Sequence, residues 1–300
     1  RVVSIGGHGS DLALDEARGV LYVANYTANQ IEVISTPDLT RLSSIPVAAQ
    51  PGSMALSPDG QYLLVTHYSN FLPPATALNG MTLIRLRTGA RQTFALPSPP
   101  LGAGFTSDNR ALVATSTEFL LYEPSTGGLT LLATLQDLVA RTLPVPPANL
   151  PPQIVAASLA VSGDGERIYG LTDTFRFRFD RHPQRLTVLG YVSDPPQGPR
   201  VVSVSRDGSY YAAGWGLFDW RGTLMAQFPS PLGLLHVGSH AIDSDRGLIY
   251  AQIPREAGEA PALMVADADN LAVRERFNLP ENLAGKSVLS ANGAYMYSIS

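Results

Sequence analysis

The stretch LSPDGQYLLVT, residues 56–66, decides the fold because it recurs in recognisable form along the whole chain. Each copy has an apolar anchor, a four- or five-residue turn and a short segment rich in Val, Ile, Tyr and Leu. All copies align without gaps, and their anchors are Leu14, Leu56, Phe105, Val161, Val204, Ile242 and Leu289. A repeat of this length indicates similar structural units that bury a shared core between them.

The turn of the repeat predicts a β-hairpin. Residue pairs that tolerate the positive φ of a tight strand reversal stand at Asp59-Gly60, Asp164-Gly165, Asp207-Gly208 and Asn292-Gly293. Further strand pairs follow most hairpins, such as IEVIS (31–35) and RLSSIPV (41–47). Four strands per copy, repeated radially, predict an all-β, seven-bladed β-propeller with four-stranded antiparallel blades. Residues 131–142 instead carry the apolar spacing of a helix.

The two ends of the sequence predict how the last blade is built. RVVSIGG (1–7) is similar to RLSSIPV rather than to the start of a copy, and residues 295–300 form the second strand of the seventh hairpin. We therefore expect residues 1–300 to form a single propeller domain whose last blade is closed by the N-terminal strand. That blade then lacks one strand, so we expect this chain to be a piece of a longer one that supplies it.

Composition limits the classes of function. The 300 residues contain no Cys, which excludes thiolate zinc sites, iron–sulfur clusters and cysteine nucleophiles. A net charge of −4 gives no footprint for nucleic acid, and no apolar run reaches the ~18–20 residues of a membrane span. Neither Gly-x-Ser-x-Gly nor His-Glu-x-x-His occurs. We therefore expect no nucleic-acid partner, no membrane span in this segment and no cofactor.

Candidate ligand-binding residues lie at one end of the predicted blades. In a propeller, the connection entering each first strand and the connection leaving each second strand open on the same face, around the central channel. Alignment on the anchors places at this channel mouth His8, Asp11, Asn25, Tyr26, His67, Tyr68, Trp215, His236, His240 and Lys286. Imidazoles and carboxylates bind metals or act as bases, and aromatic rings stack on sugars or peptides. The same residues could equally be a solvated lining or, for the aromatic ones, packing between blades.

The segment FRFRFD (175–180) alternates Phe with Arg, which is typical of a strand with two distinct faces. Blades are covered on both sides, so Arg176 and Arg178 need hydrogen-bond partners or a position at the outer rim.

A family resemblance rests on the first two copies. VLYVANYTANQIEVIS (20–35) and VAAQPGSMALSPDGQYLLVTHY (47–68) resemble YVTN-type β-propeller repeats, with LYVAN (21–25) the closest single match. The other copies resemble the family only in the eleven residues of the hairpin. The resemblance implies a seven-bladed propeller of an exported prokaryotic protein that is extracellular, on the cell surface or periplasmic, often beside other domains. It implies no particular chemistry.

Two functions follow as hypotheses. The favoured one is a non-enzymatic binding or scaffold module with a protein, peptide or carbohydrate ligand at the channel face. The alternative is a metal-assisted hydrolase or lactonase-like enzyme at the channel mouth, built from His8, Asp11, His67, His236 and Lys286. A quinone- or haem-dependent redox enzyme is a third class, although no Cys-x-x-Cys-His motif is present to attach a haem.

Overall fold

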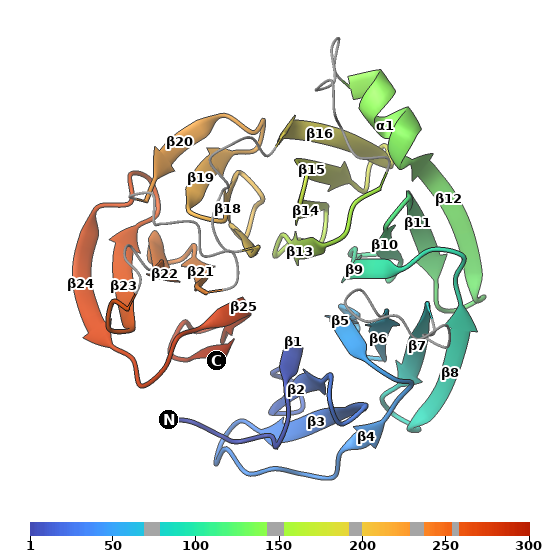
Figure 1. Ribbon diagram of the computed structural model, residues 1–300, viewed down its shortest axis with the longest axis horizontal. Coiled ribbons are helices and arrows are strands. Elements are labelled where there is room, and N and C mark those ends of the chain that lie inside the picture. The colour runs from blue at the N-terminus through green and yellow to red at the C-terminus, as the bar shows by residue number, and fades with distance from the viewer. Residues whose placement is uncertain (69–78, 143–152, 192–199, 229–236, 254–257) are drawn as a thin grey trace. The chain divides into compact units, whose positions relative to one another are not determined.

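The computed structural model describes residues 1–300 except 69–78, 143–152, 192–199, 229–236 and 254–257. Over these described residues the fold is all-β apart from one helix, as expected. It consists of four-stranded antiparallel blades of the β-propeller type, each a meander in which consecutive strands pair (Figure 1). The chain divides into two compact units, the first holding β1–β12 and the second β13–β26. Within the described residues, no helix is both long and apolar enough to cross a membrane.

The first unit contains three four-stranded sheets. The first sheet consists of β1 (Gly9–Asp15), β2 (Val20–Asn25), β3 (Gln30–Ser35) and β4 (Ile45–Pro46). The second consists of β5 (Pro51–Leu56), β6 (Tyr62–His67), β7 (Gly80–Arg85) and β8 (Ala90–Ala95). The third consists of β9 (Pro100–Phe105), β10 (Ala111–Thr115), β11 (Glu118–Glu123) and β12 (Gly128–Thr134), and α1 (Leu135–Thr142) follows it. The first strands β1, β5 and β9 lie side by side, and the fourth strands form the opposite edges of the sheets (Figure 1).

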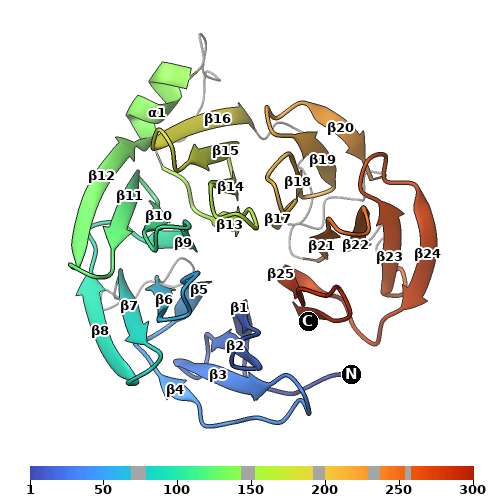
Figure 2. The same ribbon diagram turned by 180° about the vertical axis from the view of Figure 1, so that it is seen from behind.

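The second unit contains three four-stranded sheets and one two-stranded sheet. Its first sheet consists of β13 (Ala157–Val161), β14 (Arg167–Thr172), β15 (Phe175–Asp180) and β16 (Arg185–Tyr191). The next consists of β17 (Val202–Val204), β18 (Tyr210–Ala213), β19 (Gly216–Asp219) and β20 (Leu224–Gln227). Then come β21 (Ser239–Asp243), β22 (Leu248–Gln252), β23 (Ala262–Asp267) and β24 (Val273–Asn278), followed by the pair β25 (Ala284–Leu289) and β26 (Met296–Ile299). Figure 2 shows the same order of strands within each sheet from behind.

A hydroxyl group that donates to an Asp or Asn side chain closes five of the seven predicted hairpins, whereas the other two have the ion pairs Asp15–Arg18 and Asp243–Arg246. Ser57 Oγ donates to Asp59 Oδ1 at 2.6 Å and accepts the Tyr62 N–H at 2.9 Å. The same contact recurs at Thr106–Asp108, Ser162–Asp164, Ser205–Asp207 and Ser290–Asn292. The glycines of the four predicted turns have φ between +64° and +69°. The positive φ expected at these turns is therefore confirmed, and the short hydroxyl bond explains why Ser or Thr precedes the Asp or Asn by two residues.

The core of each unit lies between neighbouring sheets. The inner strands of a sheet inside a unit are covered on both faces and consist of nearly continuous apolar residues, so that all six residues of β2 are buried. The fourth strands are exposed by contrast, as β8 and β24 show. Met54, Leu63 and Val65 of the second sheet pack against Tyr22 of the first. Complete burial of such side chains contributes about 1.5–3 kcal/mol each to folding.

The number of complete blades differs from the prediction. The described structure has six four-stranded sheets rather than seven, and the seventh hairpin stands as the two-stranded sheet β25–β26. The N-terminal strand predicted to close that blade is not formed, since residues 1–7 have no strand pairing. Instead, this segment bonds within the first unit. Asn25 Nδ2 donates to the Ile5 carbonyl at 3.2 Å, and Arg1 Nη1 donates to the Asp38 carbonyl at 3.4 Å.

The predicted helix begins four residues later than its apolar spacing suggested. Leu131 belongs to β12, where it pairs opposite Leu120 of β11. The hydroxyl of Thr134 then accepts the Asp137 N–H at 3.0 Å, which is the contact of a helix N-cap. Leu138 and Val139 are buried, so the predicted apolar face of the helix is confirmed from that cap onward.

Candidate functional site

Three aromatic or imidazole side chains predicted at the channel mouth lie at one end of the first unit. His8 immediately precedes β1, Tyr26 follows β2 and Tyr68 follows β6. His8 is exposed, whereas Tyr26 and Tyr68 are half-buried. We call the surface formed by these three residues the end surface.

The His8–Tyr26 pair is held by its backbone. The His8 N–H donates to Thr27 Oγ1 at 3.1 Å, and the Tyr26 N–H donates to the His8 carbonyl at 2.8 Å. The two rings meet edge to face, with centroids 6.4 Å apart and planes at 88°. An accessible imidazole is therefore fixed beside a phenol ring without any contribution from a ligand.

Tyr68 depends on a glycine in the neighbouring strand. A Cβ atom added to Gly52 would lie 2.5 Å from Tyr68 Cε1 and 3.1 Å from its Cδ1. The ring therefore lies directly against the main chain of β5, a close approach that only glycine permits. The Pro-Gly pair of the repeat has a physical role here, because it makes room for the aromatic ring.

Asp11 is a structural link rather than an accessible carboxylate. Its Oδ2 accepts the Met54 N–H at 2.7 Å and the Ser53 hydroxyl at 3.0 Å, and its Oδ1 accepts the Leu12 N–H at 2.7 Å. The residue is only 7% exposed. These bonds join β1 to β5, so Asp11 fastens the first sheet to the second.

Asn25 is buried in a polar cluster that the sequence did not predict. Its Nδ2 donates to Glu32 Oε1 at 2.9 Å, and Glu32 also accepts from Gln30, Arg41 and Ser44 at 2.7–2.8 Å. Burial alone would raise the pKa of Glu32, but the hydrogen bonds outweigh it and lower the pKa to about 2. Glu32 is therefore ionised at neutral pH and fully engaged in holding the first sheet together.

His67 is enclosed at the end of β6. Its Nε2 shares a hydrogen bond of 2.8 Å with Thr82 Oγ1, which in turn lies 2.9 Å from Thr93 Oγ1. The side chain has no exposed surface, and burial lowers the pKa of the imidazole to about 4. His67 is therefore neutral at pH 7 and packs as part of the second sheet.

The second unit encloses two further candidates. His240 on β21 has no exposed surface, and burial lowers its pKa to about 4. Its Nδ1 lies 2.6 Å from Ser203 Oγ. This hydroxyl–imidazole pair has the composition of a nucleophile and its base, but at 8% and 0% exposure it is closed to a substrate. Trp215 is 3% exposed and packs against Phe228, so it belongs to the core.

Two candidates remain. Lys286 on β25 is half-buried, and His236 lies outside the described residues. Among the residues that the structure describes, no group of three or more His, Cys, Asp or Glu side chains could hold a metal ion. Apart from Lys286 and His236, the set predicted from the sequence therefore splits into buried structural groups and the exposed or half-buried residues of the end surface.

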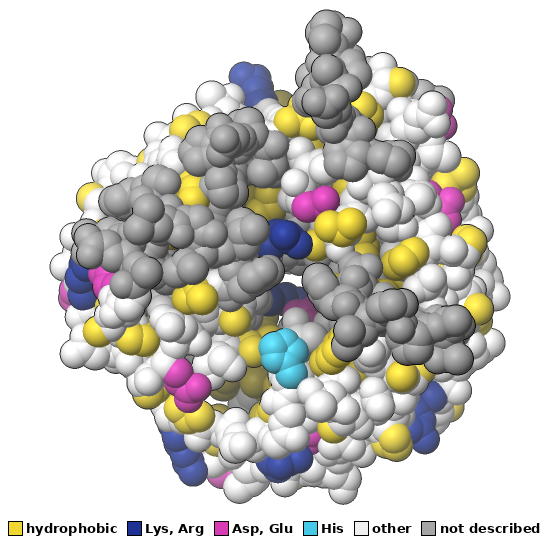
Figure 3. All heavy atoms as spheres, viewed as in Figure 1, with side chains coloured by type: hydrophobic (Ala, Val, Ile, Leu, Met, Phe, Trp, Pro, Cys, Tyr) yellow, Lys and Arg dark blue, Asp and Glu magenta, His cyan; other side chains and the backbone are white. Residues whose placement is uncertain are grey.

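The described part of the face shown in Figure 3 has no large patch of one charge. On the described part of the face shown in Figure 3, the basic and acidic side chains stand singly or in small groups among polar and apolar atoms.

The sequence contained a pattern that could have identified Glu32 as a buried, hydrogen-bonded carboxylate. Glu32 stands inside the apolar strand segment IEVIS, where a strand covered on both faces leaves a charge no access to water. Such a residue must have buried partners, and the amide of Asn25 and the guanidinium of Arg41 supply them.

Comparison with known proteins supports the fold alone. No protein-family model matches the sequence, and no curated protein sequence matches it. The structure is similar to Kuenenia stuttgartiensis hydrazine synthase, with a TM-score of 0.68 and 13% sequence identity over 99% of this chain and 94% of that chain. At such identity the likeness concerns the arrangement of the blades and carries no chemistry with it.

Proposed function

We propose that this chain is a non-enzymatic binding module whose ligand rests on the end surface of the first unit. One observation carries the proposal, namely the division of the candidates by burial. Asp11, Asn25, His67 and His240 are buried and hydrogen-bonded within the fold, whereas His8 reaches solvent beside the half-buried Tyr26. Four of the polar candidates are thus enclosed, while the imidazole of His8 and the ring of Tyr26 remain accessible for contact with a ligand.

The chemistry of the end surface favours a neutral or weakly polar ligand. An imidazole and a phenol ring fixed edge to face offer apolar area together with hydrogen-bonding atoms, and Tyr68 adds a second phenol. Such rings stack on sugars and on aromatic or proline side chains, and they lose little conformational entropy on binding. The ligand is accordingly a carbohydrate, a peptide or a protein loop.

The cellular setting of the proposal rests on the resemblance of residues 20–35 and 47–68 to YVTN-type repeats. We place the module outside the cytoplasm, in an extracellular, cell-surface or periplasmic protein that carries other domains. The propeller then presents the end surface to its ligand, while the other domains anchor the module or join several copies of it.

The test titrates a panel of neutral oligosaccharides and proline- or tyrosine-containing peptides into the protein and records binding by calorimetry. Tyr26→Ala should weaken any saturable binding about tenfold, since a central aromatic contact is worth roughly 1–2 kcal/mol. Tyr295→Ala removes a tyrosine that is 65% exposed in the second unit and serves as the matched control. Equal affinity of the Tyr26→Ala variant and the wild type would contradict the proposal.

The enzymatic alternative has its own readout on the same samples. Elemental analysis of the purified protein, followed by assays with lactone and ester substrates, should detect neither stoichiometric metal nor turnover above the buffer rate. Turnover that disappears in His8→Ala would replace the binding module with a hydrolase.

A further inference from the structure

An exposed tryptophan lies in the turn between β19 and β20, in the second unit. Trp220 is 39% exposed, in contrast to the buried Trp215. The guanidinium of Arg221 lies over the indole ring, 4.7 Å from its centroid. Among the described residues, the Arg221 side chain forms no hydrogen bond or ion pair. Tryptophan and arginine are among the residues that contribute most binding energy at protein interfaces. An exposed pair of them is therefore a candidate binding surface.

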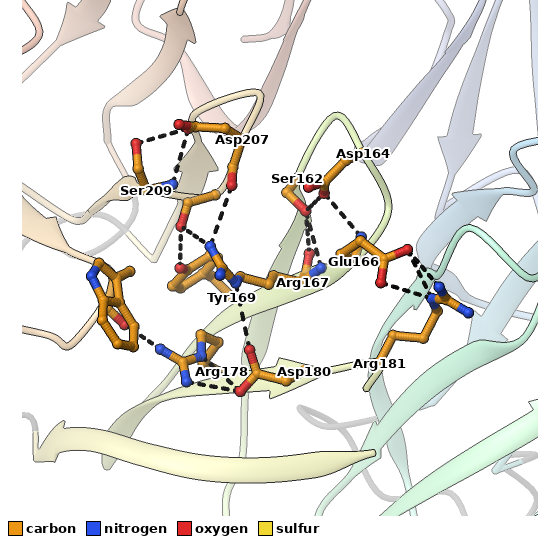
Figure 4. Close-up of polar contacts among 12 residues, drawn as sticks. Ser162, Asp164, Glu166, Arg167, Tyr169, Arg178, Asp180, Arg181, Asp207 and Ser209 are labelled. Atoms are coloured by element: carbon orange, nitrogen blue, oxygen red, sulfur yellow. Dashed lines mark hydrogen bonds and ion pairs between the residues drawn. The ribbon is translucent and has the colours of Figure 1, made fainter. Parts of the chain in front are cut away.

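The arginines of the FRFRFD segment hold this turn in place. Arg178 Nη1 donates to the Trp220 carbonyl at 2.5 Å, and Arg176 Nη1 donates to the Gly222 carbonyl at 3.4 Å. Arg178 is itself fixed by Asp180 at 2.8 Å, and Figure 4 shows the two side chains facing each other on β15. Both sides of the turn are thus bonded to the preceding blade. The turn is organised before any partner arrives, which lowers the entropic cost of binding.

The surroundings of Trp220 are positively charged. The guanidinium of Arg178 lies 5.1 Å from the indole centroid, and that of Arg167 lies 6.0 Å from it. With Arg221, three guanidinium groups meet at the ring, and Asp180 pairs with two of them. Asp219 of the same turn accepts the Arg221 N–H at 2.9 Å, so three guanidinium groups lie near two carboxylates. This local excess of positive charge favours an acidic partner.

The strand that leaves the turn offers an edge for pairing. Among the residues that the structure describes, β20 pairs with β19 alone, and it contains no charged residue, in contrast to β24 with its sequence VRERFN. Leu224 is 51% exposed and Met225 is 46% exposed. Charged side chains protect sheet edges from strand addition, and their absence leaves the β20 edge open to it.

We propose that the rim surface formed by Trp220, Arg221, Leu224 and Met225 binds an extended acidic segment of a partner protein. The segment adds as a strand to the β20 edge, where main-chain hydrogen bonds supply affinity. Its carboxylates pair with Arg221, and its apolar side chains cover Trp220 and Leu224. Arg176 and Arg178 act as positioning residues, because they hold the turn rather than contact the partner.

The test uses a fluorescently labelled synthetic peptide that alternates glutamate with valine, and its counterpart that alternates lysine with valine. Anisotropy titrations should show saturable binding of the glutamate peptide alone, weakening as salt rises. Arg221→Glu should reduce the affinity about tenfold or more. Arg87→Glu is the matched control, because Arg87 is an exposed arginine in the corresponding turn between β7 and β8.

A second readout separates the rim surface from general charge effects. Binding of the peptide should change the intrinsic tryptophan fluorescence of the wild-type protein. Trp220→Phe should abolish this change, while circular dichroism confirms that the variant is folded. Failure of the glutamate peptide to bind, or equal loss in the Arg87→Glu and Arg221→Glu variants, would overturn the proposal. Neither outcome bears on the end surface, which lies in the first unit.

Discussion

The buried imidazole of His240 makes the stability of the protein depend on pH above the range in which carboxylates titrate. Its pKa falls from 6.5 to about 4 because the folded protein excludes water from the ring. In the unfolded chain the imidazole takes up a proton near pH 6.5, and in the folded chain it does so only near pH 4. The unfolded state therefore binds more protons between these values, and the free energy of unfolding falls as the pH is lowered from 6.5 to 4.

The size of the effect follows from the two pKa values. A gap of this size corresponds to about 3 kcal/mol once the pH is below both, because each pH unit is worth about 1.4 kcal/mol. Between pH 7 and pH 5, about 2 kcal/mol of this stability is lost. A loss of that size is a large share of the roughly 5–15 kcal/mol that stabilises a typical protein.

The perturbation is His240→Asn, which keeps an amide near the position of Nδ1 and within reach of the Ser203 hydroxyl but cannot titrate. The smaller side chain should lower the free energy of unfolding by about 1–2 kcal/mol at pH 7. At pH 5 the variant should equal or exceed the wild type, because only the wild type has lost the imidazole contribution. All other groups titrate in both proteins and cancel in the difference.

The assay is urea unfolding followed by tryptophan fluorescence at pH 7, 6 and 5. The same change at the exposed His8 is the control, and it should alter the free energy of unfolding at pH 7 by less than about 0.5 kcal/mol. A constant difference between wild type and His240→Asn from pH 7 to pH 5 would mean that His240 gains its proton equally well in the folded and unfolded states, so burial would not lower its pKa.

Three further changes test the fold. Glu32→Gln should lower the free energy of unfolding at pH 7 by about 3 kcal/mol, and the deficit should shrink below pH 4.5, because the stability supplied by the lowered pKa of about 2 is lost as the pH falls through that window. Gly208→Ala should cost about 1–3 kcal/mol in thermal unfolding, because φ is +66° and the new Cβ would lie 3.1 Å from Arg167 Cδ. Gly170→Ala should cost at least about 1–3 kcal/mol, because its Cβ would overlap the Phe177 ring, and an unchanged melting temperature would contradict that packing.

The parts of the fold that local chemistry determines could be predicted from the sequence. Asp-Gly turns preceded by Ser form the same hydrogen bonds in every such copy, so a single stretch such as residues 56–66 defines the hairpin. The count of complete blades was not predictable in this way. The seventh hairpin has the same kernel as the others, and whether two more strands join it depends on contacts between segments distant in the chain.

The candidate site shows a similar division. Alignment on the anchors placed His8, Tyr26 and Tyr68 correctly at the ends of strands, because position along a strand is a property of the repeat. It did not separate His8 from His67, since burial depends on whether a neighbouring sheet or loop covers the side chain. The sequence did not identify Trp220 as a candidate. Its turn is ordered by hydrogen bonds from arginines of the preceding blade, and these bonds are evident only in the structure.

Chemical modification of the histidines tests most directly the claim that the fold encloses the reactive candidates and exposes the binding ones. Treatment of the native protein with diethyl pyrocarbonate at pH 7, followed by mass spectrometry of its peptides, reports the accessibility of each imidazole. We expect rapid modification of His8, whereas His67 and His240 should be modified only after unfolding. Modification of His67 or His240 in the native protein at the rate of His8 would contradict this claim.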